Sequence, residues 1–292
     1  MVKFFASFVV FTSLVFAEII PSQLDSNLSV LGGEKNDSTL ITKIKSFVSP
    51  RSYNENEKFI KLIFKPESKY YRSDRVDVVK VVKVLKSNGL LNLLFKKPQE
   101  LQLSFKTSGS PLFFVKIMGD TLRNIGYYRY VTTESNLDSS EFTWTISLKS
   151  EYATDPLILQ AELQKSGSDI IDIERISKTE WQYSIDMSNA YLNIPILNNE
   201  TEMEVKRSLY AHWLNVQSIK NLRIKSSFSD SWYPQISYYD KQLHLLKMIK
   251  KDKKTRAIAL VIPESAKYIK ISDMYTLKNV KNNLILVPTG AR

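Results

Sequence analysis

The chain has 292 residues, with 41 lysines and arginines against 30 aspartates and glutamates, and a formal net charge of +11. It contains no cysteine, which excludes thiol nucleophiles, redox pairs, iron–sulfur ligation and cysteine zinc sites. Its two histidines cannot form a three-histidine metal site within one chain. The basic balance favours anionic partners. It is equally typical of a protein whose basic residues lie on solvated faces and bind nothing.

The first residues have the layout of a cleaved secretory signal. Lys3 precedes an apolar run over residues 4–16, and Ala17 supplies a small residue before a cut at Glu18. A membrane anchor is the alternative, but a span needs about 20 apolar residues and Glu18 interrupts the run. We therefore expect residues 1–17 to be removed, and the mature chain to be periplasmic or otherwise exported, soluble, and without a transmembrane span.

Residues 18–57 are rich in polar and turn-forming residues, and we expect a flexible segment there. Asn27 and Asn36 lie in N-x-S sequons, and each follows an acidic residue two positions earlier, Asp25 and Glu34. The pattern D/E-x-N-x-S/T resembles the extended sequon of bacterial periplasmic N-glycosylation, known best from campylobacters. The resemblance covers these residues alone, and it implies a bacterial glycoprotein modified at both asparagines.

Residues 58–189 predict an α+β domain. Residues 59–64 have the length of a short strand, and the spacing of valines over 74–88 predicts a helix that ends before Gly89. The patterns then alternate as strand, helix, strand, strand, helix and strand, at 101–106, 110–125, 127–134, 142–149, 155–166 and 169–176. This order is the split βαβ plan of a ferredoxin-like module, and residues 180–186 predict one extra strand.

Residues 190–292 predict an all-β domain. Short apolar runs separated by turn residues recur at 191–197, 212–218, 221–228, 233–239, 242–249, 256–262, 267–273 and 283–288. Strands of this length and spacing indicate a β-sandwich or a jelly-roll-like fold.

The densest aromatic stretch of the chain suggests a ligand platform. If residues 233–239 form a strand, Tyr233, Gln235 and Tyr239 share one face. Flat tyrosine rings can stack on sugars while an amide reads their hydroxyls. The alternative is a strand whose tyrosines merely cover a sheet face. The opposite face carries the residues that we expect in the core, Trp232, Ile236 and Tyr238.

Two more candidates follow along the chain. His244 is expected to point outward from the predicted strand 242–249, where a ligand role competes with a solvated one. The projecting loop after that strand carries a basic cluster, Lys250, Lys251, Lys253 and Lys254. Such a cluster suits anionic glycans or lipid headgroups. It also suits a solubilising loop that discourages pairing at a sheet edge.

The sequence contains no G-x-S-x-G, HExxH, EF-hand, P-loop or GxGxxG pattern, so we predict no catalytic residue, metal or cofactor. We expect an exported, non-catalytic binding or scaffold protein of a bacterial cell envelope, whose C-terminal sandwich binds a glycan or a protein partner. Export argues against a nucleic-acid partner, and contact with a membrane surface stays open. The alternatives are a structural subunit of a secretion or flagellar assembly, and a glycan hydrolase that uses two carboxylates.

Overall fold

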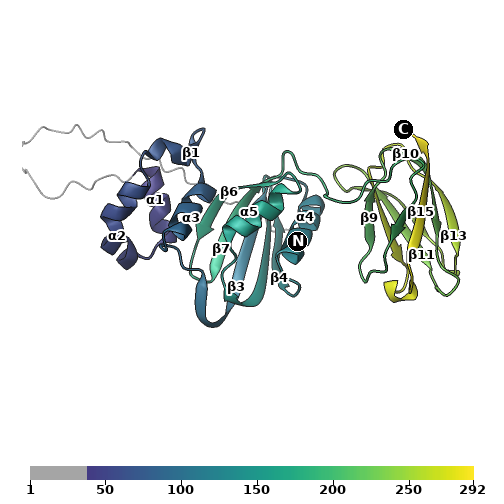
Figure 1. The fold of residues 1–292 in the computed structure, drawn as a ribbon, viewed down its shortest axis with the longest axis horizontal. Helices are drawn as coiled ribbons and strands as arrows, with labels where there is room; N and C mark the ends of the chain where they lie inside the picture. The colour runs from purple at the N-terminus through teal and green to yellow at the C-terminus, as the bar shows by residue number, and fades with distance from the viewer. Residues whose placement is uncertain (1–37) are drawn as a thin grey trace, which may run out of the picture. The chain divides into compact units, whose positions relative to one another are not determined.

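The computed structural model of the chain describes residues 38–292. The predicted signal peptide, its cut after Ala17 and the sequons at Asn27 and Asn36 lie outside the described residues. The fold is mixed α and β and mostly β (Figure 1). Within residues 38–292, no helix is long and apolar enough to cross a membrane.

Two helices precede the first sheet, α1 (Thr39–Phe47) and α2 (Pro50–Ile63). Ser38 starts α1, because its hydroxyl accepts the backbone N–H of Ile41 at 3.3 Å. Leu40, Ile44 and Phe47 are fully buried on one face of α1. The expectation of a flexible segment up to residue 57 is therefore wrong for residues 39–57, and the expected strand at 59–64 is the end of α2.

A short connection leads from α2 to α3 (Val78–Ser87) through a 3₁₀ turn (Glu67–Tyr70) and the two-stranded ribbon β1 (Tyr71–Arg72) and β2 (Arg75–Val76). The carboxylate of Asp77 caps α3 by accepting the N–H of Lys80 at 3.1 Å. The valines of α3 are buried at positions that follow the helical period, which confirms the helix predicted over 74–88.

One five-stranded sheet follows, in the order β4-β5-β3-β7-β6. Its elements are β3 (Leu94–Thr107), α4 (Pro111–Asn124), β4 (Val131–Leu137), β5 (Phe142–Tyr152), α5 (Pro156–Gln164), β6 (Asp169–Arg175) and β7 (Glu180–Asp186). The predicted succession of strands and helices is confirmed. The extra strand β7 does not lie at an edge: it runs parallel to β3 and separates β3 from β6.

Alternation along the strands fixes which face of this sheet is buried. Leu101, Leu103 and Phe105 of β3 are fully buried, whereas Gln102 between them is exposed. The buried face joins α1, α3, α4 and α5 in one hydrophobic cluster, the first cluster. Figure 1 shows α4 and α5 lying against the sheet. At one edge of this sheet, β4 pairs with β5 alone among the described strands, and all seven β4 residues are exposed.

Eight further strands form two four-stranded antiparallel sheets, in the orders β13-β10-β15-β8 and β12-β11-β14-β9. They are β8 (Met203–Val205), β9 (His212–Asn215), β10 (Ile219–Lys225), β11 (Pro234–Tyr239), β12 (Leu245–Lys250), β13 (Ala257–Val261), β14 (Tyr268–Asp273) and β15 (Leu284–Ala291). A 3₁₀ turn (Leu277–Asn279) precedes β15.

The two four-stranded sheets bury their facing sides in a second cluster. Leu222 and Leu286 enter it from one sheet, and Ile236 and Ile271 from the other. The strand expected at 191–197 is absent from the described chain, apart from a single bridge at Ile196. Asn193 and Pro195 interrupt that run, which explains why its apolar pattern does not extend into a ladder.

Candidate ligand-binding site

The predicted core face of the aromatic stretch is confirmed. Trp232, Ile236 and Tyr238 are fully buried in the second cluster. The indole N–H of Trp232 donates to the carbonyl of Ser272 at 3.0 Å, so the burial of this large side chain leaves no unpaired donor. Strand alternation had therefore separated the core residues of the stretch correctly from the rest.

The opposite face does not form one platform. Tyr233 meets Tyr275 edge-on, with ring centroids 5.1 Å apart, whereas Tyr239 packs on Trp213 at 5.0 Å. The two tyrosines are six residues apart along an extended strand, about 20 Å, so one sugar ring cannot touch both. Tyr239 is also half-buried against the first cluster. Gln235 lies between them, and its amide contacts the sulfur of Met248 at 3.9 Å.

His244 lies in a tight turn before β12 rather than inside a strand, and its side chain is 68% exposed. Its Nδ1 lies 2.8 Å from a carboxylate oxygen of Asp240. Partial burial raises the pKa of Asp240, but hydrogen bonds from His244 and Gln242 lower it more, and the net pKa is lowered. This contact and the hydrogen bond from the His244 N–H to the same carboxylate, at 2.9 Å, tie His244 to the turn.

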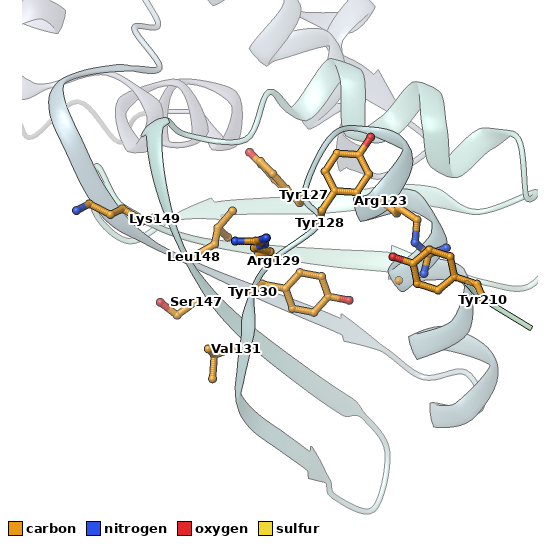
Figure 2. Close-up of a pocket in the computed structure, with 11 residues that line it drawn as sticks. Arg123, Tyr127, Tyr128, Arg129, Tyr130, Val131, Ser147, Leu148, Lys149 and Tyr210 are labelled. Atoms are coloured by element: carbon orange, nitrogen blue, oxygen red, sulfur yellow. The ribbon is translucent and has the colours of Figure 1, made fainter. Parts of the chain in front are cut away.

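A cavity that the sequence did not predict lies on the α/β part of the chain and has a volume of about 570 Å³. Figure 2 shows its lining side chains. They come from the second half of α4, the segment after α4, the start of β4, β5 and the segment before β9: Gly119, Arg123, Tyr127, Tyr128, Arg129, Tyr130, Val131, Ser147, Leu148, Lys149 and Tyr210. The lining contains three cations and four tyrosines and no carboxylate.

A glycine turn at the end of α4 positions the aromatic segment of this cavity. Gly126 has φ +101°, which a residue with a side chain rarely adopts. Its N–H donates to the carbonyl of Arg123 at 3.0 Å, and the N–H of Tyr127 donates to that of Leu122 at 2.8 Å. This is the Schellman pattern of a helix C-terminus. It fixes the direction in which the next residues leave the helix.

The tyrosines of this segment alternate between the core and the cavity. Tyr127 is buried, and its hydroxyl pairs with that of Thr154 at 2.9 Å. Tyr128 is 73% exposed, so one face of its ring is available to a ligand. Tyr130 is half-buried, and its ring meets Trp144 edge-on with centroids 5.8 Å apart. Burial raises the pKa of the Tyr130 phenol, which therefore stays a neutral hydrogen-bond donor at physiological pH.

The cations lie along the cavity rather than at one point. Figure 2 shows Arg123 beside Tyr210 at one end and Lys149 at the other. The guanidinium of Arg123 lies 4.8 Å from the ring centroid of Tyr210, and it also donates to Asp120 at 3.0 Å, which offsets part of its charge. Neither Arg129 nor Lys149 forms an ion pair with another described residue. These two side chains supply the uncompensated positive charge.

A second cavity of about 490 Å³ continues the first. It shares Tyr127, Tyr128, Arg129, Leu148 and Lys149 with the first cavity. It extends along β5 to Ser150, Glu151 and Tyr152. Together the two cavities form one elongated groove, which we call the Tyr–Arg groove. Its lining, in which Glu151 is the one carboxylate, suits a ligand that has several rings and negative charge, because rings can stack on tyrosines and anions can pair with the cations.

The sequence carries one local signal for this groove. The run Tyr127 to Tyr130, "YYRY", interleaves aromatic and basic residues. The pattern predicts a strand over 127–134, whereas β4 begins only at Val131. Lys149 and Tyr210 are brought to the groove by folding alone, so no local pattern connects them to it.

Within residues 38–292, no group of three or more histidines, aspartates and glutamates is arranged to hold a metal ion. A comparison of the sequence with models of known protein families found no match, and a comparison with curated proteins found none either.

Proposed function

We propose that the chain is an exported, non-catalytic binding protein of a bacterial cell envelope, and that it binds an anionic glycan in the Tyr–Arg groove. The observation that carries the proposal is the lining of the first cavity, which combines three cations with four tyrosines and has no carboxylate. A uronic-acid or phosphate-bearing glycan offers both sugar faces and negative charges. The proposal of export rests on the signal-like pattern of residues 1–17, and periplasmic glycosylation at Asn27 and Asn36 rests on the sequons.

We propose further that the five-stranded sheet is a variant of the ferredoxin-like plan and that the two four-stranded sheets are a jelly-roll-like sandwich. The chain order of elements between β3 and β6 supports the first assignment, although β7 lies between β3 and β6. Eight antiparallel strands in two sheets around one cluster support the second. We also propose a domain boundary between residues 189 and 190, whereas the boundary expected at residue 58 falls inside α2, and α1 already belongs to the first cluster.

The glycan proposal is tested by titrating the purified chain with a uronic-acid hexasaccharide and with a neutral hexasaccharide. We expect binding to the acidic sugar alone, and affinity that falls as salt is added, because exposed charges are screened. Arg129→Gln combined with Lys149→Gln should lower the affinity at least tenfold, and Tyr128→Ala several-fold. Lys278→Gln combined with Lys281→Gln removes the same charge from exposed positions outside the groove and should change little. Equal losses in both double variants would contradict the proposal.

A second candidate function, a structural subunit of an envelope assembly, is favoured by the open edge of β4. This strand pairs only with β5, is exposed along its whole length and carries a single charged residue, Glu134. An unpaired strand edge is a template for a partner strand. Crosslinking in cells followed by mass spectrometry distinguishes the two functions. Crosslinks from residues 131–137 to a defined set of proteins would support the assembly role, and their absence would leave the glycan proposal alone.

A further inference from the structure

Two loops lie side by side at the surface of the C-terminal sheets. One connects β12 with β13 and spans 251–256, and the other connects β10 with β11 and spans 226–233. The N–H of Ser226 donates to the carbonyl of Arg256 at 2.8 Å, and the N–H of Thr255 donates to that of Trp232 at 2.9 Å. Each loop runs from one four-stranded sheet to the other, and these backbone bonds join the two loops into one continuous surface.

This surface is strongly basic. Six cations lie in or next to the first loop, Lys247, Lys250, Lys251, Lys253, Lys254 and Arg256. All six are exposed, and none forms an ion pair with another described residue. Asp252 is the only acidic residue of the loop. The positive charge is therefore concentrated and uncompensated, which attracts an anionic partner.

An exposed aromatic ring lies within the same surface. Phe228 is 77% exposed, more than any other large hydrophobic side chain among the described residues. The guanidinium of Arg256 lies 3.8 Å from the centroid of its ring. A phenylalanine ring has no hydrogen-bonding group, so its transfer from water to an apolar environment is favourable.

The loop that carries Phe228 is held by a buried carboxylate. Asp230 is 1% exposed and accepts backbone N–H groups from Ser227 at 3.1 Å, Lys281 at 2.8 Å and Asn282 at 3.1 Å. A carboxylate that receives several backbone donors fixes the path of both loops that it joins. Phe228 is thus presented from an anchored turn two residues away, rather than from a loose tip.

We propose that this surface, the Lys–Phe surface, docks on a membrane that contains anionic lipids. The lysines face the headgroup phosphates, and the ring of Phe228 enters the boundary between headgroups and acyl chains. A soluble polyanion would use the lysines but would leave the ring in water. The anchored, exposed phenylalanine is therefore the observation that favours a lipid surface. The Lys–Phe surface lies outside the lining of the Tyr–Arg groove, so this proposal does not depend on the glycan.

The test uses the full chain and co-sedimentation with vesicles of phosphatidylcholine alone or with 30% phosphatidylglycerol. We expect binding to the anionic vesicles alone, with an affinity that falls steeply with salt. Neutralising Lys250, Lys251, Lys253 and Lys254 together to glutamine should lower the partition coefficient by more than a hundredfold, since each cation near an anionic surface contributes about fivefold. Phe228→Ala should lower it about tenfold. Phe228→Trp should bind vesicles as the wild type does. The fluorescence emission of the introduced indole should shift to the blue when vesicles are added.

The matched control neutralises four exposed lysines of the α/β part to glutamine, Lys58, Lys83, Lys96 and Lys97. Both quadruple variants then have the same net charge, and circular dichroism establishes that each is folded. Equal loss of binding in the two quadruple variants would overturn the proposal, because net charge alone would explain it. The proposal would also fail if wild type ignored anionic vesicles, or if Phe228→Ala bound them unchanged while a soluble polyanion competed fully.

Discussion

At the scale of single residues, Trp232 is the largest side chain of the second cluster. It is fully buried, and its indole N–H is paired with the carbonyl of Ser272. Trp232→Ala should lower the free energy of unfolding by about 3–5 kcal/mol, because it leaves a large cavity. Trp232→Phe retains most of the volume and should cost clearly less. Urea denaturation followed by near-ultraviolet circular dichroism measures both, and equal losses would argue against the cavity as the cause.

Tyr238 is buried in the same cluster as Trp232, and its hydroxyl has no hydrogen-bond partner among the described residues. Burial raises the pKa of this phenol from 10.0 to about 12. Tyr238→Phe should leave the free energy of unfolding unchanged or raise it slightly, because it removes an unpaired buried polar group. Tyr275→Phe, at an exposed ring, is the control.

The same shift predicts a dependence on pH. The folded-state pKa of Tyr238 lies above the unfolded value, so the neutral phenol contributes stability that is complete below pH 10 and is lost as the pH rises to about 12. Tyr238→Phe should therefore lose stability less steeply than wild type over this interval. Urea titrations at pH 8, 10 and 11 compare the slopes, and parallel slopes would mean that other groups dominate.

The sequence identified the buried side of the aromatic stretch because alternation along a strand is a local property. It could not show that the outer face is partly covered at Tyr239, since the covering residue, Trp213, lies 26 positions earlier in the chain. The Tyr–Arg groove was missed for the same reason. Its cations Arg123 and Lys149 come from α4 and β5, and only tertiary packing brings them to one cavity.

At the scale of elements, α1 is a structural part of the first cluster. Ile44→Ala should lower the free energy of unfolding by about 2–5 kcal/mol, because Ile44 is fully buried there. Thr42→Ala, on the exposed side of the same helix, should change it by less than about 0.5 kcal/mol. Chemical denaturation of the two variants compares the faces directly. Similar small effects would mean that α1 contributes little to the fold.

Two glycines that end helices allow the cost of backbone strain to be compared with the cost of a steric clash. Gly89 and Gly167 have φ values of +70° and +67°, but a Cβ on Gly89 would meet nothing within 4 Å. A Cβ on Gly167 would lie 2.3 Å from the carbonyl oxygen of Asn189. Gly89→Ala should cost about 1–2 kcal/mol for the left-handed conformation alone, and Gly167→Ala clearly more. Thermal unfolding of the pair tests this, and equal costs would contradict the contact.

Local patterns identified most elements but not all of their boundaries or neighbours. The helical spacing of Leu40, Ile44 and Phe47 lies in a stretch whose serines and asparagines are typical of loops, so α1 was missed. The apolar run at 59–64, taken alone, fits both the strand period and the helical period. It is helical because it continues the helix that begins at Pro50. The place of β7 beside β3 depends on a pairing across about 80 residues, which no window of sequence contains.

At the scale of the whole molecule, the second cluster draws its members only from residues 197–286. A fragment of residues 190–292 should therefore fold cooperatively by itself. It should be less stable than the full chain, because Leu243 and Tyr268 belong to the first cluster and would be exposed. Near-ultraviolet circular dichroism and urea denaturation of the fragment test this. A fragment without fixed tertiary signals would show that the two clusters fold as one unit.

The position of Trp213 has a consequence for spectroscopy. The other three tryptophans are buried, whereas Trp213 on β9 is half-buried, with the ammonium groups of Lys116 and Lys270 5.3 and 5.7 Å from its ring centroid. Because Lys116 belongs to α4, the surroundings of the Trp213 indole depend on the contact between α4 and β9. Its fluorescence, isolated by acrylamide quenching, is thus a native optical reporter. It would register a loosening of that contact before any secondary structure is lost.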